Sequence, residues 1–108
     1  MNTDSLVRGL LAGDAHAIRE LRARAPTSDD VTLLVAAALT SDGWAALLDR
    51  AGRLAAGLPD RQLVTIARAH LGGDDDRARL LARDHLAEHP ESLLVAHIAT
   101  ATSTRRTP

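Results

Sequence analysis

Glycine and proline punctuate this chain of 108 residues at a nearly constant interval. Three glycines recur at equal intervals, at Gly13, Gly43 and Gly73. Three prolines recur at almost the same interval, at Pro26, Pro59 and Pro90. Two independent markers therefore indicate a repeat of about 30 residues, which is the length of one helix–turn–helix unit.

Seven segments of helical length lie between these breaks. Leu and Ala supply most of the apolar residues, while Phe and Tyr are absent and Trp44 is the only aromatic residue. This composition favours helices, because strands prefer β-branched and aromatic side chains. We take the three prolines to end the second, fourth and sixth helices. The predicted helices cover about residues 4–12, 15–25, 29–39, 42–58, 60–71, 74–89 and 91–101.

The repeat predicts an all-α protein, folded as a short α-solenoid of about three antiparallel helical hairpins with a C-terminal capping helix. A single hairpin cannot bury both of its apolar faces, so the next hairpin must stack on it. We expect residues 1–101 to form one helical-repeat domain. Residues 102–108 carry no apolar side chain, and we expect a disordered tail there.

Composition and charge argue against several classes of function. The formal net charge is -1, and the arginines are spread over several predicted helices, so direct nucleic-acid binding is not expected. The absence of cysteine excludes disulfides, iron–sulfur clusters and thiol catalysis. No signal peptide or membrane-spanning stretch is visible, which predicts a cytoplasmic protein without membrane contact. We expect no cofactor.

One part of the chain resembles a known family of helical repeats. The run from Gly73 through Ala78 to Pro90 is similar to the second helix of a tetratricopeptide repeat, with a Gly-Asp turn, a small residue near the helix start and a closing proline. The resemblance covers positions 59–90 well and the rest loosely. The aromatic positions of that family are missing, since Arg68 or Ala69 stands where one would be.

The resemblance implies that the third, fifth and seventh helices line a concave groove that binds a peptide or a partner helix. The residues that this places in the groove are Val35, Leu39, Arg61, Val64, Thr65, Arg68 and Val95. The carboxylate-clamp subtype of that family uses Lys and Asn, which this chain lacks apart from Asn2.

The first predicted helix is unusually apolar for the end of a repeat array. Terminal repeats normally need a polar outer face. This helix instead carries four large apolar residues, Leu6, Val7, Leu10 and Leu11. They form a candidate surface for self-association, and a homodimer is one predicted assembly.

A short motif near the end of the sixth helix could suggest metal chemistry. His85, Glu88 and His89 form the pattern H-x-x-E-H, in which two histidines one turn apart bind zinc and a glutamate acts as base. Pro90 follows at once and places His89 at a helix end, and no third ligand is evident nearby. We therefore expect no metal and no catalytic residue, with a zinc-dependent hydrolase as a remote alternative.

These observations together favour binding over catalysis. The main hypothesis is a non-catalytic protein–protein interaction module that holds a peptide or helix of a partner, or another copy of itself. A regulatory protein that sequesters a transcription factor or another effector is the alternative.

Overall fold

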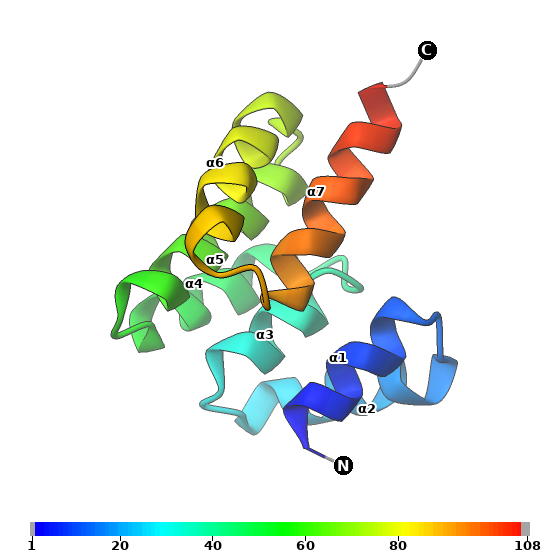
Figure 1. Ribbon diagram of the computed structural model, residues 1–108. Helices are drawn as coiled ribbons and strands as arrows, with labels where there is room; N and C mark the ends of the chain where they lie inside the picture. The colour runs from blue at the N-terminus through cyan, green and yellow to red at the C-terminus, as the bar shows by residue number, and fades with distance from the viewer. Residues whose placement is uncertain (1, 107–108) are drawn as a thin grey trace.

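The computed structural model describes residues 2–106 of the chain, including the side chains of residues 2–102. It confirms the all-α class, because this part of the chain forms seven α-helices and one 3₁₀ turn without any strand. In chain order they are α1 (Thr3–Leu11), α2 (Ala15–Arg24), the 3₁₀ turn (Ala25–Thr27), α3 (Val31–Ala38), α4 (Trp44–Leu54), α5 (Leu58–Leu71), α6 (Asp75–Glu88) and α7 (Leu93–Arg106). Short loops join them into successive hairpins (Figure 1).

The first and third hairpins share one kind of turn, in which an aspartate follows a glycine. Gly13 and Gly73 have φ angles of 79° and 89°, in the left-handed region that glycine adopts without strain. The next residue, Asp14 or Asp74, accepts a hydrogen bond from a free N–H group at the start of the following helix. Gly43 in the middle repeat has a φ of -86° and α4 has no side-chain cap, so the second turn is built differently.

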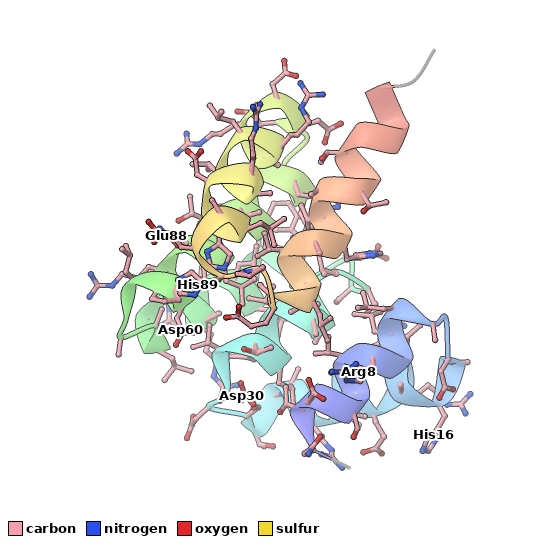
Figure 2. The ribbon with its side chains drawn as sticks, viewed as in Figure 1. Arg8, His16, Asp30, Asp60, Glu88 and His89 are labelled. Carbon is pink, nitrogen blue, oxygen red and sulfur yellow. The ribbon has the colours of Figure 1, made fainter. Side chains whose placement is uncertain are left out.

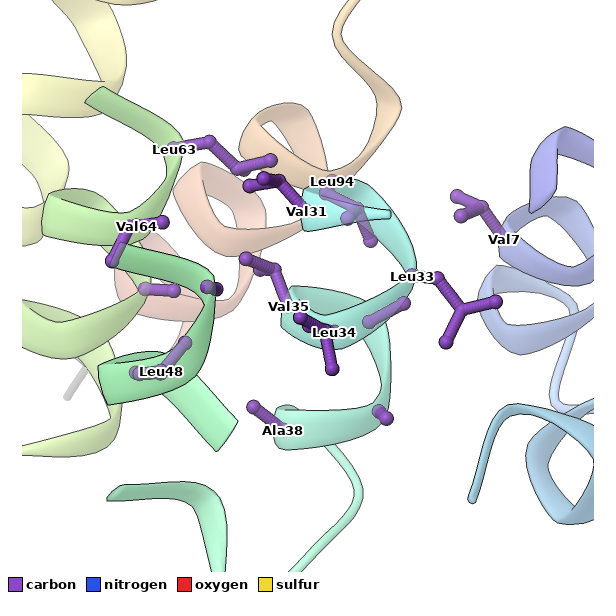
Figure 3. Close-up of a cluster of buried hydrophobic side chains, with 14 of the residues drawn as sticks. Val7, Val31, Leu33, Leu34, Val35, Ala38, Leu48, Leu63, Val64 and Leu94 are labelled. Carbon is purple, nitrogen blue, oxygen red and sulfur yellow. The ribbon is translucent and has the colours of Figure 1, made fainter. Parts of the chain in front are cut away.

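Helix α3 is buried along almost its whole length. Val31 and every residue from Leu33 to Ala38 are buried, and α3 contacts α1, α2, α4 and α5. Figure 3 shows side chains of α3 pointing toward Val7 of α1 in one direction and toward Leu48 of α4 in another. A helix that is apolar on all sides requires such an environment. The core of the protein is therefore arranged around α3.

The hairpins pack on one another, but they do not form an open stack. Alternate helices are neighbours, since α1 contacts α3, α3 contacts α5, and α5 contacts α7. In addition, α1 contacts α7, although these are the first and last helices of the chain. Each repeat of an open solenoid contacts only the repeats next to it. The arrangement thus departs from the predicted solenoid, and its apolar residues form one shared core.

Pro59 begins a helix instead of ending one, which corrects a predicted boundary. Helix α4 ends at Leu54, and Pro59 lies in the first turn of α5. Proline is favoured in a first turn because the N–H group that it lacks would have no helical partner there. Leu58 consequently belongs to the start of α5, where its side chain is 63% exposed.

Helix α7 continues through Arg106, so the predicted disordered tail is wrong from residue 102 to residue 106. Thr102 is buried, and its Oγ1 donates a hydrogen bond to the backbone oxygen of Ile98 at 3.1 Å. This bond satisfies the hydroxyl group within its own helix, which allows a polar residue in the core. Positions 107 and 108 of the predicted tail lie outside the described residues.

Candidate functional site

The three valines that were predicted to line an open groove lie in the core. Val35, Val64 and Val95 are buried, because α3, α5 and α7 turn these side chains into the shared apolar cluster. Leu39 is partly buried against the same cluster. The predicted groove is therefore wrong at the valines, which no partner can reach in the folded chain.

The polar residues of the predicted groove stay on the surface of α5. Arg61, Thr65 and Arg68 are all exposed. Thr65 Oγ1 donates a hydrogen bond to the backbone oxygen of Arg61 at 2.9 Å, and Arg68 Nη2 pairs with Asp49 Oδ1 of α4 at 2.9 Å. Arg68 is thus engaged inside the chain, while Arg61 and Thr65 border a separate hollow.

The N-terminal face predicted for self-association is covered within the monomer. Leu6 and Val7 are buried, and Leu10 and Leu11 are partly buried against the core. Helix α1 packs on α2, α3 and α7, and these contacts occupy its apolar side. The predicted self-association surface is therefore corrected, because the apolar side of α1 packs against other helices of the same chain.

The hollow beside Arg61 is a groove of about 260 Å³ between α5 and α6, named here the α5–α6 groove. Its lining consists of Leu58, Arg61, Gln62, Thr65, Ile66, Leu81, Asp84 and His85. Ile66 is buried and Leu58 is exposed, so the groove has an apolar base and an apolar rim. Arg61 on one helix and Asp84 on the other give its two walls opposite charge.

A larger cleft of about 410 Å³ lies where α1, α3, α5 and α7 begin, and is named here the helix-start cleft. It is lined by Thr3, Asp4, Val7, Asp30, Thr32, Pro59, Asp60, Leu63, His85, His89, Glu91, Ser92, Leu93 and Leu94. Figure 2 shows three of these residues, Asp30, Asp60 and His89, on three different segments around it. No arginine of residues 2–102 belongs to this lining.

Three carboxylates of this cleft come from corresponding places in the repeat. Asp30, Asp60 and Glu91 follow one another at the interval of the repeat, and they lie at the beginnings of α3, α5 and α7. They were not predicted as a group from the sequence. Their spacing was the available signal, because helices of equivalent repeats begin at the same end of the molecule.

Some of the cleft carboxylates already have partners. Asp4 Oδ2 accepts from Arg8 Nε at 2.8 Å, and both side chains are largely exposed. Asp30 caps α3 by accepting from the backbone N–H of Thr32 at 3.0 Å, and it accepts from Thr3 Oγ1 at 2.5 Å. None of the ion pairs among the described side chains joins Asp30 or Asp60 to a cation.

His85 is shared by both hollows and is held by one hydrogen bond. The residue is only 5% exposed, and its Nδ1 lies 2.7 Å from Oε1 of Gln62 on α5. Because a carbonyl oxygen can only accept, this contact assigns the proton of the neutral ring to Nδ1. The Nε2 atom, for which the described residues supply no hydrogen-bond partner, is then an acceptor.

Burial keeps His85 neutral. Desolvation lowers the pKa of His85 below its ordinary value of 6.5, and His89 lowers it further by charge repulsion. Glu91 and Glu88 act in the opposite direction. The ring centres of His85 and His89 are 4.9 Å apart, which explains their coupling. At neutral pH the cleft therefore holds an uncharged imidazole beside carboxylates.

The zinc pattern is not completed by the fold. Within the described part of the chain, no group of three or more His, Cys, Asp or Glu side chains is placed to hold a metal ion. His89 Nδ1 lies 3.6 Å from Glu91 Oε1, and His85 is bound to Gln62 instead of facing a third ligand. Among the helices of the described residues, none is both long enough and apolar enough to cross a membrane.

No protein-family model, curated protein or solved structure matches this chain. The resemblance to tetratricopeptide repeats therefore stays a prediction.

We expect the stability of the protein to fall as the pH drops below about 6.5, in part through His85. The unfolded chain binds a proton at the ordinary pKa, whereas the folded chain binds it only at lower pH. This contribution is complete above the ordinary pKa and is lost as the pH falls through the folded pKa. Urea unfolding of the wild type and of His85→Gln, at about pH 7.5 and about pH 5.5, measures it.

The exposed His16 on α2 offers a matched control. His85→Gln should lose less stability between the two pH values than the wild type, while His16→Gln should behave as the wild type does. Equal losses in all three proteins would contradict the role given to the burial of His85.

Proposed function

We propose that this chain is a non-catalytic interaction module that binds a peptide or helix of a partner protein in the α5–α6 groove. The observation that carries the proposal is the exposure of Leu58 at 63% beside a groove of about 260 Å³ with a buried apolar base. An apolar groove between helices is a common receptor for the apolar face of an amphipathic segment.

The chemistry of the groove suggests which segment it accepts. Ile66 and Leu81 are apolar lining residues, and the exposed Leu58 extends this apolar surface toward solvent. Arg61 of α5 and Asp84 of α6 supply one charge of each sign on opposite walls. A partner segment with a leucine-like anchor flanked by an acidic and a basic residue would match all of these groups, and the charges would set its direction.

A selection from a display library of short peptides tests the proposal. Peptides enriched on the wild-type protein should carry an apolar anchor, and Leu58→Asp should weaken their binding about tenfold or more, because burying an unpaired carboxylate against them is unfavourable. Leu80→Asp is the matched control, since Leu80 on α6 is 55% exposed and lies outside the lining of the groove.

Three outcomes would contradict the proposal. One is a selection without enrichment above background. Another is equal weakening by the two substitutions, which would make binding a general response to charge. The third is a dimer in light scattering that Leu58→Asp dissociates, since the groove would then be occupied by a second copy of the chain.

A further inference from the structure

The lining of the α5–α6 groove contains one buried titratable side chain, which is His85 of α6. This residue is only 5% exposed, and it lines the groove together with the apolar side chains of Ile66 and Leu81. A buried imidazole resists protonation, because its charged form loses the hydration that it has in water. The charge state of His85 should therefore respond to any molecule that fills the groove.

A hydrogen bond joins His85 to the opposite wall of the groove. Its Nδ1 lies 2.7 Å from Oε1 of Gln62 on α5, and Gln62 lines the groove as well. The ring cannot turn out toward water without losing this bond. Protonation of His85 consequently costs either the hydration of the charge or the contact between the two helices that form the groove.

The charged groups around His85 do not outweigh this cost. His89, whose ring centre is 4.9 Å away, lowers the pKa of His85, whereas Glu91 and Glu88 raise it. Burial is the largest of the four effects and lowers the pKa. From α7 the adjoining lining receives only uncharged residues, Leu93 and Leu94. The other charged side chains of the two linings are Arg61 and Asp84 in the groove and Asp4, Asp30 and Asp60 in the helix-start cleft.

We propose that peptide binding in the α5–α6 groove is coupled to the charge of His85, so that the groove releases its peptide at mildly acidic pH. This coupling rests on the proposed function, since it concerns the same groove and the same partner segment. An apolar anchor beside Ile66 and Leu81 keeps water away from the groove side of the ring, and it packs less favourably on an imidazolium than on a neutral imidazole. The peptide and the proton therefore compete.

Nuclear magnetic resonance measures this competition on the wild-type chain. The probe is a histidine-free peptide enriched in the display selection and synthesised with blocked ends. The ring resonances of His85 give its pKa in the free protein and in the protein saturated with peptide. The pKa should be lower in the complex, because coupling between two ligands is reciprocal. Each unit of lowering corresponds to about tenfold weaker peptide binding at a pH below both values.

The peptide affinity gives a second readout of the coupling. Calorimetric titration should give a Kd that is about threefold or more higher at about pH 5.0 than at about pH 7.5. His85→Gln cannot take up this proton, so its Kd should be nearly the same at both pH values. His89→Gln is the matched control, because His89 lines the helix-start cleft but not the groove. This control should retain the loss of affinity at low pH, and circular dichroism confirms that each protein is folded.

Three results would overturn the coupling while the proposed function stands. One is a pKa of His85 that is equal in the free and the peptide-bound protein. Another is a wild-type Kd that does not change between the two pH values, and the third is an equal loss of affinity in His85→Gln. If that variant does not fold, the two pKa values of the wild type decide. A selection without enriched peptides would contradict the proposed function itself, and the coupling with it.

Discussion

Replacing Leu34 with alanine should reduce the free energy of unfolding by about 2–5 kcal/mol. Leu34 is fully buried on α3, the helix that contacts α1, α2, α4 and α5. Alanine removes three carbon atoms from this site and leaves a cavity between elements that are fixed by their other contacts. A domain of this size is stable by only about 5–15 kcal/mol, so the loss is a large fraction of the total.

Urea unfolding followed by circular dichroism measures this loss. Leu80→Ala is the matched control, because Leu80 on α6 is 55% exposed and the same change there should cost less than about 0.5 kcal/mol. A loss below about 1 kcal/mol at Leu34 would contradict the placement of α3 in the core. A changed dependence on urea concentration would show a change in the compactness of the unfolded or folded state, or the loss of one-step unfolding.

The local signals in the sequence predicted the elements well. Seven helices occur in the predicted order, although α4 ends earlier than the proline pattern placed its end, and the turns at Gly13 and Gly73 have similar φ angles. Asp14 and Asp74 cap the helices that follow these two turns. These features depend on backbone conformation and on neighbours within a few residues, so periodicity and cap chemistry are sufficient to find them.

The packing of the helices was predicted less well. Helix α3 has the sequence VTLLVAAA, which is apolar on nearly every side and is typical of a helix surrounded by others. The comparison with an open solenoid nevertheless assigned Val35 to an exposed groove. Repeat spacing defines which helices are neighbours but leaves the curvature of the array open, and the contact between α1 and α7 follows from that curvature.

For the candidate sites as well, features set by neighbouring residues could be predicted from the sequence, whereas features set by helix packing could not. Arg61 and Thr65 were predicted as binding residues and do border the α5–α6 groove. Asp60 and Glu91 were visible as periodic acidic residues, but each of them has a sufficient local reason, since carboxylates favour helix starts. The pairing of His85 with Gln62 joins positions 23 residues apart, so only the packing of α6 on α5 reveals it.

Replacing Gly9 with alanine should destabilise the protein by about 1–3 kcal/mol, although alanine is the better helix former. A Cβ atom at Gly9 would lie 2.4 Å from Cβ of Ala17, which is buried on α2. Ala17 cannot turn aside, because its Cβ is fixed to the backbone. Helices α1 and α2 would have to separate, and this cost exceeds the gain of about 1 kcal/mol from helix propensity. Thermal and urea unfolding measure the difference.

Gly52 on α4 is the matched control, because the same substitution has the opposite expected sign there. A Cβ atom at Gly52 would meet only Cγ1 of Val64 at 3.8 Å, which is an ordinary contact. Gly52→Ala should therefore stabilise the protein by about 0.5–1 kcal/mol through helix propensity alone. Gains of similar size at both positions would contradict the close approach of α1 to α2. Opposite signs would show that the first hairpin is held together at Gly9 by the lack of a side chain.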